Sequence, residues 1–560
     1  MYFPKWMMPI TQENLEIRKL KNIYHKTIKI YGPPGTGKTT TLVEKVVRKY
    51  LAKGIDPEQI AFISFTNKAV NTARKRTLEA FPKFSDKQFS RFQTLHKYCR
   101  RYFNENIFDI KECMIDFALE ETIIKHTDKR LDDEGFVYKD WSLSIYDKSR
   151  NMMRPPIDVY KEESYKEDNI DLFLKKISAY EAYKKSNPQN PLIDFTDMIE
   201  RAIDEITFPP IQVLILDEAQ DFTPLQWSVI YKIVENVKRV YLAGDDDQAI
   251  YKWNGADPKY FTTYFPGRKV VLRQTYRFGS NIHSFSQMIR KDITDSIEKE
   301  FRANPNKTGQ IKRYLSFKEI NFTKYHGSWF FLARVNKVVN QLRMMAKQEG
   351  LYFSDNKGNK SFNENEWLAI RAWTALTKGK SIQKKEVQAV YKYIRELKDA
   401  SFREDYFWKD QSEYAEYNLE YLEKECGLDL PEDMKTKPWM HVLNRNFIPS
   451  RKLYFISLLK RYGQKTLDQS PKIIIDTIHS VKGDEADNVL LFNKCDYASD
   501  YNRKNKQERI DENRVIYTAI TRAVDSVHIL YAKDRYYYPI GKHYLTYQQE
   551  KIYHDRSKHI

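Results

Sequence analysis

The chain has 560 residues, of which 41% are hydrophobic and 14% aromatic, a composition that excludes a disordered or collagen-like protein and suggests roughly three to five structural units. Its 94 basic and 76 acidic side chains give a net charge of +18, which favours a polyanionic partner such as nucleic acid, although a basic surface serving only solubility stays open. Four scattered cysteines exclude a disulfide scaffold, and no apolar run approaches the roughly 18 residues of a membrane span.

The first predicted element is a short β-prone run at 28–31, followed at once by a glycine-rich loop and then by apolar residues at helical spacing. The glycines let successive backbone N–H groups face a phosphate, and the helix N-terminus adds the positive end of its dipole. We expect Lys38 to reach the terminal phosphates and Thr39 to ligate Mg²⁺. The loop consists of Gly32, Pro33, Pro34, Gly35, Thr36, Gly37, Lys38 and Thr39. The pattern predicts a nucleotide-binding P-loop.

The next informative element is the apolar run at 213–216, which is typical of a strand buried on both faces. This strand ends in Asp217 and Glu218. A carboxylate at the carboxyl end of such a strand is placed to hold Mg²⁺, and a second one can orient an attacking water. We therefore assign Asp217 to the metal and Glu218 to the water, and together with the P-loop they predict an NTPase.

Further motifs follow in chain order, from residue 12 to residue 523. They are Gln12 in 9–12, Phe65, Thr66 and Asn67 in 63–69, Thr94 and His96 in 92–96, 194–198, Gln248, Tyr251 and Trp253 in 243–256, Tyr276 and Arg277 in 274–277, His479 and Glu485 in 477–485, and Arg522 in 515–523. Together with the P-loop and 217–221, this set resembles the ordered motifs of superfamily 1 helicases of the UvrD/Rep/PcrA type.

The resemblance implies an α/β fold with two RecA-like P-loop NTPase domains, each a parallel sheet flanked by helices and interrupted by a mainly helical accessory domain. It places ATP and Mg²⁺ between the two RecA-like domains. Arg277 and Arg522 would act as arginine fingers from the second domain, and Gln248 would contact the γ-phosphate. The remaining nucleotide contacts would be Gln12 to the adenine edge, Tyr276 stacked on the adenine face, Thr40 beside the P-loop and Glu485 to the ribose.

The same resemblance implies a single DNA strand crossing both RecA-like domains. Its phosphates would be held by polar motif residues and its bases would stack on aromatic rings, which tolerate any base sequence. Stacking is favoured over core packing for Trp253, whereas both interpretations stay open for Phe65 and Tyr251. The expected DNA contacts are Phe65, Thr66, Asn67, Thr94, His96, Tyr251, Trp253 and His479.

Several positions depart from the family pattern. Thr40 stands where these helicases usually carry an arginine that backs the adenine, so the preference for ATP is less secure here. Asn254 replaces an arginine, Asp484 replaces a leucine and Thr275 replaces an asparagine. None of these changes removes a residue that the chemistry requires, and they indicate a divergent member.

The motif order predicts six segments. We expect 1–95 and 193–274 to form the first RecA-like domain, with accessory domain 1B at 96–192 inserted between them. We expect 275–352 and 469–560 to form the second RecA-like domain and a short tail, with accessory domain 2B at 353–468.

The expected activity is that of an ATP-dependent DNA helicase or translocase, moving 3′ to 5′ on single-stranded DNA and unwinding duplex DNA in repair, recombination or replication. An RNA or RNA–DNA helicase stays open, because phosphate and stacking contacts discriminate sugars poorly. So does an ATP-gated single-strand-binding protein that removes other proteins without processive unwinding. We expect a monomer or weak dimer in the cytoplasm or otherwise inside the cell, with single-stranded DNA and duplex/single-strand junctions as partners, unidentified loading or repair proteins beside them, and no membrane.

Overall fold

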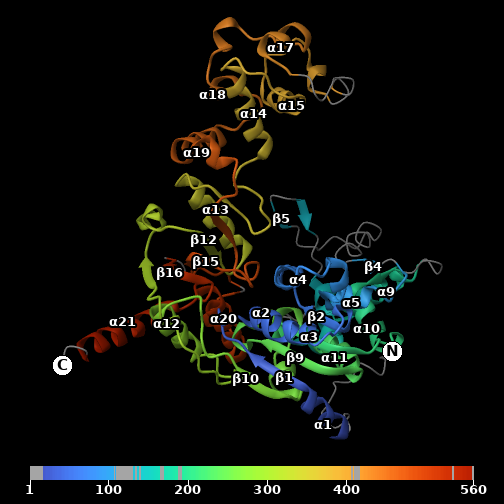
Figure 1. Cartoon of the computed structure of the whole chain (residues 1–560). Coiled ribbons are helices and arrows are strands. Elements are labelled where there is room, and N and C mark those ends of the chain that lie inside the picture. The colour runs from blue at the N-terminus through green and yellow to red at the C-terminus, as the bar shows by residue number, and fades with distance from the viewer. Residues whose placement is uncertain are drawn as a thin grey trace. The chain divides into compact units, whose positions relative to one another are not determined.

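The computed structural model describes residues 17–105, 107–108, 130–132, 135–137, 141–163, 170–186, 192–404, 408, 416–497, 499–532 and 535–557 (Figure 1). The chain divides into two compact units. The first comprises 1–311, 501–525 and 539–560, and the second comprises 312–500 and 526–538. Gln12 lies outside the described residues.

A six-stranded sheet forms the centre of the first unit, with strand order β10-β1-β9-β8-β2-β3. Every neighbouring pair in it is parallel. The carboxyl ends of all these strands therefore meet at one edge, where ligands bind in open parallel sheets. The strands are β1 (Thr27–Tyr31), β2 (Ile60–Ser64), β3 (Phe92–Thr94), β8 (Ile211–Asp217), β9 (Val237–Gly244) and β10 (Arg268–Val271).

Two hydrophobic cores cover the two faces of this sheet. Successive residues of β8 alternate between them, with Val213 and Ile215 in one core and Leu214 and Leu216 in the other. Burial on both faces explains why these strands are continuously apolar. The helices that flank the sheet are α1 (Ile17–Lys26), α2 (Lys38–Thr40), which continues through a π-helical stretch (Thr41–Val47) into α3 (Arg48–Ala52), α4 (Asn67–Ala80), α5 (Leu95–Arg100), α10 (Phe195–Glu205) and α11 (Pro224–Glu235). The first unit also includes α12 (Ser280–Arg290), α20 (Lys506–Ile520) and α21 (Ile540–Ser557).

In the described parts of the segment between β3 and β8, further helices are α7 (Trp141–Asn151), α8 (Pro156–Glu163) and α9 (Ile170–Lys184). They pack through small cores of their own. Arg150 of α7 is buried and its guanidinium binds the carboxylates of Asp194 and Glu200, which fixes α7 against α10. The short strands of this segment are β4 (Ile107–Phe108), which pairs with β7 (Ile193–Asp194), and β5 (Arg130–Asp132), which pairs with β6 (Gly135–Val137).

The second unit contains most of another six-stranded sheet, with order β11-β16-β15-β12-β14-β13. The pairs of β12 with β14 and β15, and of β13 with β14, are parallel. Helix α13 (Asn336–Gln348) packs on this sheet through Val338, Val339 and Leu342. The strands are β11 (Gln310–Tyr314), β12 (Trp329–Ala333), β13 (Phe353–Ser354), β14 (Ile473–Thr477), β15 (Ala486–Phe492) and β16 (Ala523–Leu530).

Between β13 and β14 the second unit carries a helical group with a core separate from that of the sheet. Trp367 and Trp373 of one helix and Val390 and Tyr391 of the next lie in this core. The group gathers in the yellow and orange part of the chain (Figure 1) and consists of α14 (Glu364–Leu376), α15 (Lys384–Tyr393), α17 (Leu419–Glu425), α18 (Trp439–Val442) and α19 (Pro449–Leu467).

The predicted α/β class with two parallel sheets and flanking helices is confirmed. Among the described residues, none of the helices combines the length and the apolarity needed to cross a membrane. The six predicted domain boundaries stay a prediction.

Candidate nucleotide and nucleic-acid site

The glycine-rich loop follows β1 and opens α2, as the sequence predicts. Gly35 and Gly37 have φ of 72° and 77°, a left-handed conformation that favours glycine. Gly32 N–H donates to the Gly244 carbonyl at 3.0 Å, which ties the loop to the end of β9. The Lys38 ammonium donates to the Gly32 carbonyl at 3.0 Å and therefore lies over the loop.

Residues 274–277 hold the outer side of this loop. Thr275 Oγ1 donates to the Pro34 carbonyl at 2.8 Å, and Tyr276 N–H donates to the Gly35 carbonyl at 2.9 Å. A Cβ on Gly35 would lie only 2.5 Å from Thr275 Oγ1 and 2.4 Å from Arg277 Cβ. Thr275, which departs from the family pattern, thus shapes the P-loop directly.

Asp217 and Glu218 lie at the carboxyl end of β8 and face the same loop. Thr39 Oγ1 donates to Asp217 Oδ2 at 3.0 Å, and Glu218 Oε1 lies 3.8 Å from Lys38 Nζ. Burial, with a further contribution from the Glu218 charge, raises the pKa of Asp217 to about 6. Glu218 adopts the left-handed conformation, φ 54° and ψ 42°, which is strained for a residue with a Cβ and is typical of functional sites.

Thr39 and Asp217 suit Mg²⁺, because a buried carboxylate and a hydroxyl that already meet present two oxygen ligands side by side. Within the described part of the chain, no group of three or more His, Cys, Asp or Glu is placed to hold a metal by itself. A P-loop magnesium site needs fewer protein ligands, since phosphates and waters supply the rest. The residues therefore fit the expected ion.

Gln248 and Arg522 meet at the same edge of the sheet. Arg522 is buried, and its Nη2 donates to Gln248 Oε1 while its Nε donates to the Thr518 carbonyl at 3.1 Å. Arg277 Nη1 donates to the carbonyl of Thr521 at 2.7 Å, next to Arg522 in the chain. Both arginines and Gln248 belong to the first compact unit, together with the P-loop.

Three aromatic rings form a row beside this site. The ring centroids of Phe65 and Tyr251 are 4.9 Å apart, and those of Tyr251 and Trp253 are 6.5 Å apart. Trp253 is 55% exposed, whereas Phe65 and Tyr251 are half-buried, and Phe65 also contacts Phe222. Trp253 is therefore exposed enough to offer a ring face to a base, whereas Phe65 and Tyr251 pack beside it and support it.

The polar residues expected to meet DNA lie where neighbouring strands end. Thr66 follows β2 and Thr94 ends β3, and each hydroxyl accepts a backbone N–H as the N-cap of the next helix. Asn67 is exposed at the first turn of α4. His96 is half-exposed and its ring meets the edge of Phe195, with centroids 5.7 Å apart.

With this geometry in place, comparison with known proteins identifies the family. The sequence model of the UvrD/REP helicase N-terminal domain matches residues 13–265, and that of the UvrD-like helicase C-terminal domain matches residues 277–534. The chain belongs to the UvrD-like helicase family. These two matches cover nearly the whole chain, as does the motif series from residue 12 to residue 523.

Individual relatives are distant. The chain is 24% identical over 586 residues to a probable DNA helicase II homolog of Mycoplasma pneumoniae, an alignment that covers 88% of this chain and 80% of the relative. It is 22% identical over 380 residues to the ATP-dependent DNA helicase PcrA of Bacillus subtilis, covering 64% of this chain and 50% of that protein. Among solved structures, Arterivirus nonstructural protein 10 (helicase) aligns with 92% of this chain and 62% of its own, at 11% identity and a TM-score of 0.32, which is too low to support any inference.

One contact places an arginine beside a position that departs from the family pattern. Thr40, which replaces the family's arginine beside the adenine, accepts a hydrogen bond from Arg76 Nη1 at 2.8 Å. Arg76 is exposed on α4, 36 residues along the chain. An arginine is thus present beside position 40, but no motif in the sequence identifies it.

His479 and Glu485 lie in the second unit, in the turn that joins β14 to β15. Glu485 is exposed and His479 is half-exposed. Their expected contacts with DNA and ribose stay predictions.

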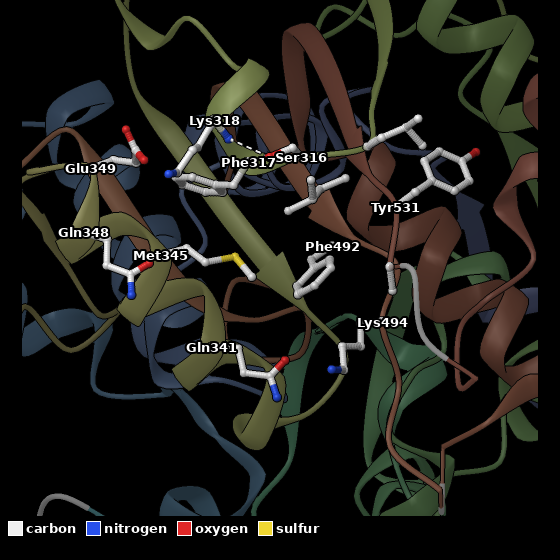
Figure 2. Close-up of a pocket in the computed structure, with 13 residues that line it drawn as sticks. Ser316, Phe317, Lys318, Gln341, Met345, Gln348, Glu349, Phe492, Lys494 and Tyr531 are labelled. Carbon is white, nitrogen blue, oxygen red and sulfur yellow. Dashed lines mark hydrogen bonds between the residues drawn. The ribbon is translucent and has the colours of Figure 1, made fainter.

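The second unit also has a hollow of about 440 Å³ that none of the expected site residues lines. Figure 2 shows the Met345 side chain directed toward Phe492, with Phe317 above them and polar side chains around the rim. The floor belongs to the core of the second sheet, so this hollow is not the site predicted from the motifs.

Proposed function

We propose that this protein is an ATP-dependent DNA helicase that moves 3′ to 5′ along single-stranded DNA and unwinds duplex DNA in repair, recombination or replication. The observation that carries the proposal is the convergence of Lys38, Asp217, Glu218, Gln248 and Arg522 at the carboxyl edge of the first sheet. Family membership adds the class of reaction, and the names of the relatives add DNA as the substrate.

The P-loop residues bind the phosphates of ATP. The backbone N–H groups of 35–39 surround the β-phosphate, and Lys38 turns its ammonium from the Gly32 carbonyl to the γ-phosphate. Tyr276 is 68% exposed next to the loop, so its ring is available to stack on adenine. Thr39 and Asp217 would hold Mg²⁺, which when bound would neutralise negative charge on the phosphates of ATP.

Hydrolysis uses the groups that face the terminal phosphate. Glu218 orients the attacking water, and its strained backbone aims the carboxylate at the loop. Gln248 contacts the γ-phosphate, and Arg522 and Arg277 stabilise the negative charge that develops on the transferred phosphoryl group. Arg522 already bonds Gln248, so both can respond together to the presence of the γ-phosphate.

Gln248 and Trp253 are only a few residues apart in the chain, so a change at the nucleotide can be passed to the bound strand. A base stacked on the exposed face of Trp253 would shift when Gln248 changes contact, which converts nucleotide state into grip on the strand. The net charge of +18 favours the phosphate backbone as the second ligand.

ATPase assays with DNA and RNA oligomers of equal length test this proposal. We expect ATP hydrolysis that single-stranded DNA stimulates more strongly than RNA and that Lys38→Ala abolishes, while Lys38→Ala still binds single strands. Stimulation by RNA alone would favour an RNA helicase. Robust DNA-stimulated hydrolysis with protein displacement but without unwinding would favour a remodelling protein, and absence of hydrolysis in the wild type would overturn the proposal.

A further inference from the structure

Lys299 is a fully buried lysine that binds all three consecutive aspartates of the 245–247 run. Its Nζ lies 2.7 Å from Asp245 Oδ1 and 3.0 Å from Asp247 Oδ2, and it also bonds the Asp246 carboxylate. The Lys299 side chain is 0% exposed. Lys299 lies in the segment after α12 and belongs to none of the sequence motifs.

This cluster is held rigidly. Three buried carboxylates would repel one another and lose their hydration without a cation, and an ammonium has three donors to satisfy them. Arg290 Nε donates to Asp247 Oδ2 at 2.7 Å, and Ile297 N–H donates to Asp246 Oδ2 at 2.7 Å. Burial alone would raise the pKa of Asp245, but the ammonium groups of Lys299 and Lys38 hold it below its ordinary value.

The second oxygen of Asp245 leads to the nucleotide site. Asp245 Oδ2 accepts from Gln248 Nε2 at 2.6 Å, and Gln248 Oε1 accepts from Arg522 Nη2. A carboxamide has a donor end and an acceptor end. With its donor end held by Asp245, Gln248 presents its oxygen to Arg522.

The backbone of Asp245 leads to the catalytic carboxylate. Asp245 N–H donates to Gln220 Oε1 at 3.0 Å, and Gln220 Nε2 donates to Glu218 Oε2 at 2.6 Å. A Cβ on Gly244 would lie 2.5 Å from Gln220 Oε1, so the glycine before Asp245 leaves room for this contact. Asp245 thus bonds Gln248 directly and supports Glu218 through Gln220.

We propose that Lys299 is a positioning residue for ATP hydrolysis, which fixes Asp245 and through it the orientation of Gln248, Arg522 and Glu218. The inference rests on the proposed ATPase function and extends it to a residue outside every motif. Because Lys299 acts on orientation and not on the P-loop, its loss lowers kcat while nucleotide affinity is retained.

A lysine that served the fold alone would behave differently, and the chain offers a matched control. Lys184 of α9 is 3% exposed and binds three carboxylates, Glu181 at 2.7 Å, Asp197 at 2.9 Å and Asp194 at 3.2 Å. Lys184→Met removes an equally buried, equally paired ammonium from a part of the first unit without expected nucleotide contacts. It should lower the melting temperature and leave kcat unchanged.

The experiment compares the full-length wild type with Lys299→Met and Lys184→Met. It measures the melting temperature, the Kd of a fluorescent ATP analogue and the kcat of DNA-stimulated hydrolysis. We expect Lys299→Met to lose about tenfold or more in kcat with Kd changed less than about threefold. A folded Lys299→Met protein with wild-type kcat, or an equal kcat loss in Lys184→Met, would overturn the inference. A wild type without ATPase activity would instead overturn the proposed function, and the inference with it.

Asp245→Asn keeps the test decisive if Lys299→Met does not fold. The carboxylate of Asp245 accepts hydrogen bonds from both Lys299 and Gln248, whereas the amide of this variant has one acceptor oxygen and can serve only one of them. We therefore expect kcat to fall while nucleotide Kd is retained. Hydrolysis by Asp245→Asn at the wild-type rate would overturn the inference. Where both single variants fold, the double variant should lose little more kcat than the worse single variant, because both substitutions act through Asp245. A double variant whose kcat loss equals the product of the two single losses would contradict this shared path.

Discussion

Thr39 Oγ1 donates a hydrogen bond to Asp217 Oδ2 at 3.0 Å, joining the end of the P-loop to the end of β8, 178 residues along the chain. This contact brings together the two residues that are expected to ligate Mg²⁺. Thr39→Val keeps the shape but removes the hydroxyl, so we expect the Mg²⁺ concentration for half-maximal ATPase activity to rise about tenfold. Thr39→Ser retains the hydroxyl and is the control. An unchanged requirement in the valine variant would exclude Thr39 as a ligand.

The pKa of Asp217, raised to about 6, predicts a pH-dependent Mg²⁺ requirement. A proton and Mg²⁺ compete for the same carboxylate. Above pH 6 the group is ionised and ready to bind, whereas below it each pH unit weakens apparent Mg²⁺ affinity by about tenfold. Titrations of ATPase activity with Mg²⁺ at several pH values measure this change. The same Mg²⁺ midpoint on both sides of pH 6 would contradict the assignment.

Glu218 is expected to act on the water and not on nucleotide binding. Glu218→Gln preserves size but not charge, so we expect nucleotide Kd to stay near that of the wild type while kcat falls by about 10² or more. Equilibrium binding and steady-state ATPase assays separate the two effects. Gln220→Glu tests the same carboxylate from its neighbour. It would replace the amide that donates to Glu218 at 2.6 Å with a second carboxylate, and kcat should fall in this variant too. Near-normal turnover in Glu218→Gln would remove it from the mechanism.

Arg76 is predicted to supply the guanidinium that Thr40 lacks. Loss of an exposed cation–π contact costs about 0.5–1 kcal/mol, so Arg76→Ala should raise the Kd of ATP about two- to fivefold. Arg48→Ala, which removes an exposed arginine paired with Glu44, is the control and should not change it. The preference for ATP over other nucleotides should narrow only in the Arg76 variant. An equal rise in the Kd of ATP in both variants would show that the loss of one positive charge, and not a specific contact of Arg76, weakens binding.

Trp253 is predicted to grip a base, because its ring is exposed at the end of the aromatic row. Stacking contributes about 1–3 kcal/mol per base, which is small when many phosphates are also held. Trp253→Ala should therefore leave basal ATPase activity intact and weaken single-strand binding modestly, while unwinding falls much more. Tyr264→Ala, at another exposed aromatic of the first unit, is the control. A destabilised Trp253→Ala protein would show that the ring serves the core.

The sequence predicted the elements whose chemistry is local. The P-loop and the segment 213–218 could be predicted because their glycine, apolar and carboxylate patterns are contiguous in the sequence. Lys299, Arg76 and Gln220 were not, since tertiary packing alone brings them to the site, and a lone lysine or glutamine has no recognisable pattern. The supporting position of Phe65 and Tyr251 likewise depends on packing against Phe222 and Trp253.

Directed, ATP-driven strand separation can be measured with tailed DNA duplexes. Duplexes carrying a 3′ single-stranded tail, a 5′ tail or both are incubated with the wild-type protein, Mg²⁺ and ATP, with Lys38→Ala as the inactive control. We expect the 3′-tailed and forked duplexes to be unwound, the 5′-tailed duplex to stay intact, and no unwinding without ATP or in the variant. Unwinding of the 5′-tailed duplex alone would contradict the proposed direction, and failure to unwind any of the three despite ATP hydrolysis would contradict the helicase itself.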